Sequence, residues 1–191
     1  IKRTASEKRV GHTGTLDPMA TGVLPVLLGR ATALSSLLLD ADKRYTAKVK
    51  LGVTTDTEDI TGNIISENKV NVTNEQLSIA LCAFRGKIMQ KPPMYSAVKK
   101  DGVRLYKLAR EGKTAEVEPR EIEIFFIDLI SPLDCDNVFE IDVHVSKGTY
   151  IRCLARDIGE FCNSSGYLIG LLRTKVGNFK LEDAVGFEFL P

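Results

Sequence analysis

Two segments of the chain alternate apolar and polar residues, and this alternation constrains the fold more than any other feature. In residues 43–51 and again in residues 138–145, every second residue is apolar and the residues between them are mostly charged or polar. A period of two is typical of a β-strand with one buried face. Both segments therefore predict strands of a sheet that covers a hydrophobic core. The apolar positions are Tyr45, Ala47, Val49, Leu51, Phe139, Ile141, Val143 and Val145.

The intervening segments predict further strands and helices. Thr73 and Gln76 have the spacing of a capping box, which predicts a helix after them. Another helix is expected from about residue 149 to 161, a short one at 30–39, and a strand at 121–130. Strands joined by both short loops and helices indicate an α+β fold, with a mixed, largely antiparallel central sheet flanked by helices and loops. The residues expected to be buried in the two longer helices are Leu77, Ala80, Leu81, Phe84, Ile151, Leu154, Ile158 and Phe161.

The composition is that of an ordinary globular domain. The chain has 191 residues, of which 43% are hydrophobic and 27% charged, so we interpret residues 1–191 as one domain with its own core. No apolar run approaches the roughly 20 residues of a membrane-spanning helix. The four cysteines include no C-x-x-C pair and only two histidines are present. A metal site is therefore not expected, and the thiols should be reduced and mostly buried in a cytoplasmic protein.

Charge is unevenly distributed, although the net charge is only +1. Residues 85–113 contain nine basic and two acidic residues, whereas residues 121–146 contain seven acidic residues and neither Lys nor Arg. Such a bipolar molecule is able to hold a polyanion on one side. Charge runs are also common on faces that merely contact water, so charge alone leaves both interpretations open.

The densest local motif is the segment Gly11–Pro25, GHTGTLDPMATGVLP. Its three glycines and two prolines indicate a loop between apolar segments. Within it lie His12 and Asp17, and a loop held rigidly beside a core is a frequent place for a catalytic group. Aspartate before proline is also a common turn former. The residues by themselves therefore permit either a catalytic or a purely structural loop.

This motif resembles the signature loop of the TruB family, the pseudouridine-55 synthases that act on the T loop of tRNA. The similarity continues in family order through Lys43–Tyr45, Gly52–Gly62, Lys91–Ala97 and Lys147–Arg152, and ends near Leu171 and Arg173. It implies the pseudouridine synthase fold and isomerisation of one uridine to pseudouridine, with no cofactor. The resemblance also implies a cytoplasmic monomer that binds the T stem-loop of tRNA. It implies no membrane association and no obligatory protein partner.

The resemblance assigns catalytic roles to four residues. Asp17 falls on the catalytic carboxylate, which acts as a nucleophile or triggers glycosidic cleavage. Tyr45 would stack on the flipped base and assist removal of the C5 proton. Arg152 would pair with Asp17 and orient it, and Asp59 is a second acid of this network. Without the resemblance, Tyr45 would be a core residue, Arg152 a surface arginine and Asp59 part of a solvated turn.

Other residues match positions that contact RNA or the target base. His12 would fill the gap that the flipped uridine leaves, and Leu171 and Tyr150 would line the substrate pocket. Residues 91–120 match a basic RNA-gripping insertion, the thumb. Its expected RNA contacts are Tyr95, Lys99, Lys100 and Arg104. His12 is alternatively a turn residue, and Leu171 alternatively belongs to the core.

The family pattern extends beyond both ends of this sequence. Its first strand and a Lys-Gly element should precede Ile1, and a C-terminal RNA-binding PUA domain or a smaller substitute usually follows. The alternatives are a subunit of an RNA-guided pseudouridylase of the dyskerin type, and a non-catalytic tRNA-binding or tRNA-folding module on the same scaffold. A hydrolase that uses Asp17 is a more distant alternative, because no partner that would activate water is visible.

Overall fold

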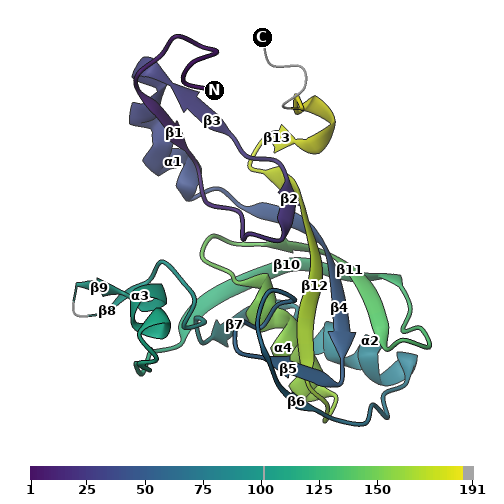
Figure 1. Cartoon of the computed structure of the whole chain (residues 1–191). Helices are drawn as coiled ribbons and strands as arrows, with labels where there is room; N and C mark the ends of the chain where they lie inside the picture. Colours follow the sequence, from purple (N-terminus) through teal and green to yellow (C-terminus); the bar gives the residue numbers. More distant parts are fainter. Residues whose placement is uncertain (101, 187–191) are drawn as a thin grey trace.

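The computed structural model describes residues 1–100 and 102–186, and it is built around one twisted sheet (Figure 1). Neighbouring strands pair in the order β13-β12-β4-β11-β10-β7, and β2 lies beside β12. All pairs are antiparallel except β2 with β12, so the predicted mixed, largely antiparallel sheet is confirmed. The strands are β2 (Ala20–Gly22), β4 (Lys43–Leu51), β7 (Gly86–Gln90), β10 (Arg120–Ser131), β11 (Val138–Val145), β12 (Gly166–Val176) and β13 (Phe179–Lys180).

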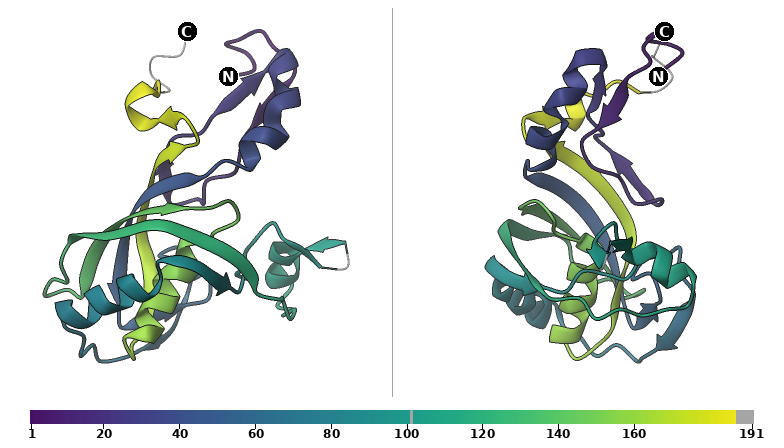
Figure 2. Two further views of the ribbon diagram at one scale, coloured as in Figure 1. Left: turned by 180° about the vertical axis from the view of Figure 1, so that it is seen from behind. Right: turned by 90° about the vertical axis from the view of Figure 1, so that its left-hand side faces the viewer.

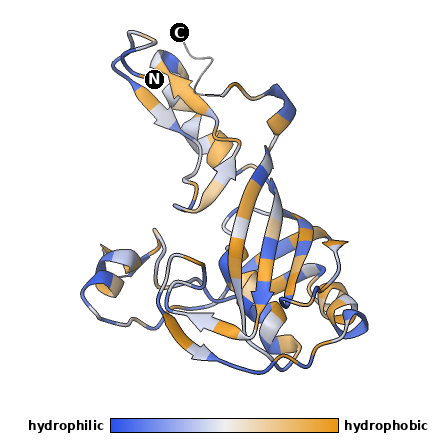
Figure 3. Cartoon of the chain, turned by 45° about the vertical axis from the view of Figure 1, so that its right-hand side comes forward, coloured by the Kyte–Doolittle hydropathy of each residue, from blue (hydrophilic) through white to orange (hydrophobic). Residues whose placement is uncertain are grey.

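The two alternating segments form β4 and β11, which are neighbours at the centre of the sheet. Their eight predicted apolar positions are all buried, and Figure 3 shows the colour alternation along the strands. Helices α2 (Asn74–Ala83) and α4 (Ile151–Phe161) cover this apolar face (Figure 2). The core therefore lies between one sheet face and these two helices.

The helix predictions hold with small corrections. Thr73 caps α2 through a complete capping box with Gln76, as predicted. The predicted helix at 30–39 is a 3-10 helix, η1 (Gly29–Leu34), followed by the short α1 (Ser35–Leu39). Burial of Phe161 was wrongly predicted, because it ends α4 at the rim of the core and is 48% exposed there.

Burial of most thiols was also wrongly predicted. Cys153 is buried and Cys162 half-buried, but Cys82 and Cys135 are exposed. Cys82 lies on the outer side of α2, directly after the buried Leu81. Cys135 lies in the turn between β10 and β11.

Several strands were not predicted. The largest omission is β12, which pairs with β4 along nearly its whole length. Within residues 52–62 lies β5 (Val53–Thr55), which forms a hairpin with β6 (Ile64–Glu67). Asp59 also forms a parallel bridge with Leu168 of β12, which fixes this hairpin to the sheet.

Two small units project from the sheet (Figures 1 and 2). The first, here called the arm, consists of β1 (Val10–His12), β3 (Val26–Leu28), η1 and α1. The second lies within residues 91–120 and contains β8 (Lys99–Lys100), β9 (Val103–Arg104) and α3 (Leu105–Arg110). A last short 3-10 helix, η2 (Leu181–Asp183), follows β13. Among the described residues, no helix has the length and apolar character needed to cross a membrane.

Candidate active site

The Gly11–Pro25 motif forms a loop that rests on the edge of β12. Its central part runs from β1 to β2, and the amide of Ala20 donates to the carbonyl oxygen of Asp17 at 2.9 Å, closing a turn. The parallel pairing of β2 with β12 places Ala20 beside Leu171 and Gly22 beside Arg173. This pairing fixes the segment that follows Asp17 to β12.

Asp17 and Arg152 form an ion pair, although 135 positions separate them in the sequence. The Nε of Arg152 donates to Oδ2 of Asp17 at 2.8 Å, and its Nη2 donates to Oδ1 at 3.3 Å. The Arg152 side chain is only 5% exposed, whereas that of Asp17 is 34% exposed. The prediction that these two side chains lie within salt-bridge distance is confirmed. One side of the carboxylate is held by the guanidinium and another is open to a ligand.

Further oxygen atoms fix the Arg152 guanidinium in place. Nη1 donates to the carbonyl oxygen of Thr57 at 2.9 Å, and Nη2 donates to that of Tyr95 at 3.0 Å. Oδ2 of Asp59 lies 3.6 Å from Nε. A planar guanidinium with acceptors on several sides has little freedom to rotate. Arg152 is therefore rigidly oriented toward Asp17.

Asp59 differs from Asp17 in its surroundings. It is 3% exposed, and its Oδ1 accepts from the Thr57 hydroxyl at 2.8 Å and from the Thr61 amide and hydroxyl at 2.9 and 2.6 Å. The surrounding loop thus occupies Oδ1, while Oδ2 faces Arg152. Of the two carboxylates beside Arg152, only Asp17 is accessible to a substrate.

The two carboxylates keep Arg152 charged despite its burial. Burial by itself would lower the pKa of Arg152, but attraction to Asp17 and the hydrogen bonds with it, together with attraction to Asp59, raise the pKa above its usual value. A buried arginine is costly unless anions and acceptors surround it. This cluster supplies both, which explains why the sequence tolerates a charge on the buried face of α4.

Gln90 and Glu58 make contacts that the sequence did not predict, and these contacts anchor the part of α4 that carries Arg152. The buried Gln90 uses its amide group to bind the backbone of Tyr150, accepting from its N–H at 2.8 Å and donating to its C=O at 3.1 Å. One turn beyond Arg152, Arg156 pairs with Glu58, and the Cys153 thiol donates to Glu58 at 3.1 Å. The one indication of this arrangement in the sequence is the four-residue spacing of Arg152 and Arg156, which places both on one face of a helix.

Tyr45 lies on β4 directly opposite Arg173 of β12. It is 8% exposed and belongs to the hydrophobic core. Burial raises its pKa above 10, while the positive charge of Arg173 acts in the opposite direction. The phenol is therefore neutral near pH 7. Leu171, two residues before Arg173, also belongs to the core. Tyr45 and Leu171 therefore both pack at the end of the core that lies near the Asp17 loop.

Comparison with known proteins places this arrangement in a family. Residues 2–151 match the family described as TruB family pseudouridylate synthase (N terminal domain). The chain belongs to the TruB family.

Curated relatives of this TruB-family chain extend the comparison. It is 51% identical to tRNA pseudouridine synthase B of Francisella tularensis subsp. novicida (strain U112), over 100% of this chain and 63% of that protein. Identity to the protein of the same name from Francisella philomiragia is 50%, with the same coverage. The chain thus spans 63% of the length of these relatives.

Solved structures support the fold assignment. A crystal structure of a Cbf5-Nop10-Gar1 complex is similar with a TM-score of 0.71 and 29% identity, over 94% of this chain and 44% of that one. An H/ACA RNP bound to a substrate RNA containing 2'-deoxyuridine gives a TM-score of 0.67 and 26% identity, over 94% and 42%. The predicted pseudouridine synthase fold is therefore confirmed.

The residues predicted to contact RNA or the target base in this TruB-family chain lie on several different elements. Tyr95 provides a carbonyl oxygen to Arg152 and is half-buried, as is Tyr150. His12 is exposed at the end of β1, where it lines a hollow with Lys8, Arg9 and Thr32. Tyr95 thus contacts the ion pair directly, whereas His12 lies on the arm.

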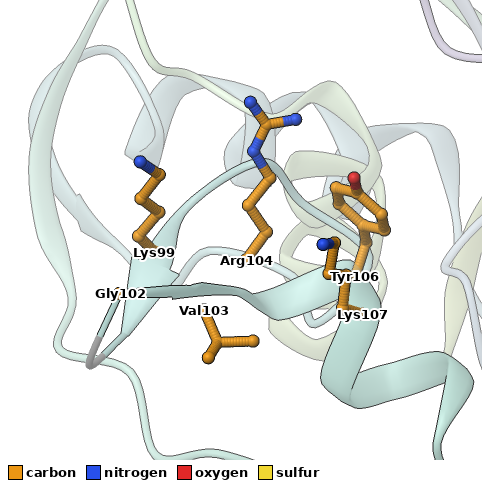
Figure 4. A pocket seen from close by; sticks show the side chains of 6 residues that line it. All are labelled: Lys99, Gly102, Val103, Arg104, Tyr106 and Lys107. Atoms are coloured by element: carbon orange, nitrogen blue, oxygen red, sulfur yellow. The ribbon is translucent and has the colours of Figure 1, made fainter.

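Lys99, Lys100 and Arg104 are exposed on the second projection and do not reach the ion pair. In Figure 4, the side chains of Lys99, Arg104 and Tyr106 extend from one side of the β8–β9 hairpin and α3. Together with Lys107 they line a shallow pocket. In residues 1–100 and 102–186, no three His, Cys, Asp or Glu side chains converge as metal ligands would.

Proposed function

We propose that this protein isomerises one uridine in the T loop of tRNA to pseudouridine, with Asp17 as the catalytic carboxylate. The observation that carries the proposal is the half-open carboxylate of Asp17, held by the buried Arg152. The names of the curated relatives support the choice of tRNA as substrate. Because those relatives are longer than this chain, the activity is proposed for the catalytic domain.

In this reaction the target base is first extruded from its stack. The uracil then separates from C1′, turns and rejoins through C5. The C5 proton passes to solvent and N1, freed from the sugar, gains a proton, so the product is an isomer of the substrate and no group passes to a second substrate. Asp17 acts either as a nucleophile or as the group that triggers cleavage. Glycosidases use carboxylates similarly but finish with water, whereas here water must stay away from the detached base. We assign to the neutral phenol of Tyr45 the roles of stacking on the base and assisting the proton transfer.

Two alternatives remain distinguishable by experiment. The RNA-guided type is represented by the Cbf5 complexes at 26–29% identity, whereas the relatives named tRNA pseudouridine synthase B reach 51%. We therefore favour a stand-alone cytoplasmic monomer. A non-catalytic tRNA-binding module is disfavoured by the intact pair of Asp17 and Arg152.

The direct test is incubation of the purified chain with a bare T stem-loop RNA. Nuclease digestion and chromatography then separate pseudouridine from uridine, which has the same mass. Product at one position, without guide RNA or protein partners, supports the proposal. Product that forms only with a guide RNA and partner proteins would indicate the RNA-guided type, and tight binding without product would indicate the non-catalytic module.

The basic projection should contribute affinity rather than chemistry. Changing Lys99, Lys100 and Arg104 to Ala should weaken tRNA binding and reduce the slope of log K against log salt by about two, because each phosphate contact contributes about 0.7–0.9. Filter binding at several salt concentrations measures this slope. Single-turnover rates at saturating RNA should change little.

The matched control removes three exposed lysines outside the projection, Lys48, Lys69 and Lys87. This variant should retain the wild-type salt slope. An equal loss of slope in both triple variants would mean that the projection makes no specific phosphate contacts.

The reaction should also proceed without a metal or other cofactor. The isomerisation exchanges no electrons and no group with another molecule, so EDTA should leave the rate unchanged. The measurement uses a short T stem-loop, because magnesium also stabilises whole tRNA. Loss of activity in EDTA that a low concentration of one metal restores would contradict this expectation.

A further inference from the structure

Arg173 is a buried charge that the proposed mechanism does not yet use. It is 1% exposed and heads the fully buried side chains by volume. No carboxylate of the described residues lies within salt-bridge distance of it. Arginine is rarely buried without a partner, because desolvating a charge is expensive unless hydrogen bonds replace the water. The partners of Arg173 should therefore reveal its role.

Among the described residues, the backbone carbonyl oxygens that accept from the Arg173 side chain all belong to the loop that carries Asp17. Its Nε donates to the carbonyl oxygen of Val23 at 2.7 Å, and Nη2 donates to that of Gly14 at 3.2 Å. A longer contact of 3.5 Å joins Nη1 to the carbonyl oxygen of Thr15. One guanidinium thus holds the chain both before and after Asp17.

The backbone of Arg173 holds the same loop. Its carbonyl oxygen accepts from the Val23 amide at 2.8 Å. Gly22 has φ +103°, and a Cβ there would lie 2.2 Å from the Arg173 carbonyl oxygen. Only glycine combines this conformation with such a close approach. The loop is therefore fitted to Arg173 at both its backbone and its side chain.

Tyr45 lies on the other side of Arg173. The two residues are directly opposite each other on β12 and β4, and the guanidinium is close enough to act on the phenol electrostatically. Arg173 therefore lies between two groups of the candidate active site. The loop with Asp17 lies on one side and the ring of Tyr45 on the other.

We infer that Arg173 is a positioning residue that fixes the Gly14–Val23 loop against Tyr45, so that Asp17 keeps its alignment with Arg152 and the substrate. This inference rests on the proposed function. A lysine at this position keeps the charge, but its single nitrogen cannot bind Gly14, Thr15 and Val23 in the same plane. A misplacement of about 1 Å is enough to slow a reaction roughly 100-fold.

The test compares the wild-type chain with Arg173→Lys in two assays. In pseudouridine formation on the T stem-loop, kcat should fall by at least roughly tenfold while KM stays near the wild-type value, as expected for lost alignment. In hydrogen exchange, the amides of residues 13–23 should exchange faster than in the wild type. Lys175→Met, which removes a positive charge two residues along β12, should match the wild type in both assays.

The outcomes separate this inference from the proposed function. An inactive wild-type chain would refute the proposed function, while faster exchange in Arg173→Lys would still support the positioning of the loop. Wild-type kcat and exchange in Arg173→Lys would overturn the inference, as would a lower melting temperature with unchanged kcat. If the lysine variant does not fold, Arg173→Gln replaces it, since its neutral amide keeps two N–H donors, and the same results are expected.

Discussion

Replacing Asp17 with asparagine or alanine is expected to abolish pseudouridine formation while tRNA binding persists. Asparagine keeps the shape of the side chain but removes the negative charge that faces Arg152 at 2.8 Å. Neither amide nor methyl group is able to attack the sugar or base as a carboxylate does. The measurement is product formation under single-turnover conditions, with filter binding of the same tRNA in parallel.

The control for this change is Asp136→Asn, in the exposed turn between β10 and β11. It removes the same charge far from the loop and should leave the rate unchanged. Mass spectrometry must confirm that the Asn at position 17 has not deamidated to Asp. A wild-type rate in an intact Asp17→Asn variant would refute the assignment of Asp17.

The second large effect is expected for Arg152→Lys, which should bind tRNA normally but react at least about 100-fold more slowly. A loss of about 3 kcal/mol of transition-state stabilisation gives this factor. Lysine keeps the charge but is unable to contact both oxygens of Asp17 together with the carbonyl oxygens of Thr57 and Tyr95. Single-turnover rates at saturating RNA measure the chemical step.

Two further variants define the role of Arg152. Arg152→Met should be slower still, because Asp17 and the buried Asp59 then lack their shared cation. Arg44→Lys makes the same chemical change at an arginine that pairs with Asp142 on the solvent side of the sheet, and it should react at the wild-type rate. Equal rates for Arg152→Lys and Arg44→Lys would contradict the proposed role of the guanidinium.

The central strands were predictable because their residues alternate strictly, as Tyr45 and the rest of β4 illustrate. Strand β12 was not predictable in this way, because its pairing with β4 shifts register after Leu168 and again after Arg173. Each shift interrupts the period of two on which the prediction depends. A buried arginine and Gly170 weaken the apolar pattern further.

The candidate site was predictable only in part, for a related reason. The resemblance to the TruB family supplied Asp17 and Arg152, and the structure places them in contact. The sequence could not show that Arg173 binds carbonyl oxygens about 150 positions away. Every residue has a backbone carbonyl oxygen, so the residue types at those positions do not indicate such a contact. It also could not show that Asp59 is enclosed while Asp17 is open, because this difference arises from tertiary packing.

The most direct test of the central claim is release of tritium from a T stem-loop RNA labelled at C5 of its uridines. Formation of the new bond at C5 expels that hydrogen, so each turnover releases one label. We expect release of one equivalent by the wild-type chain, in EDTA and without guide RNA, and none by Asp17→Asn. Release at equal rates by both proteins, or by neither while the RNA remains bound, would contradict it.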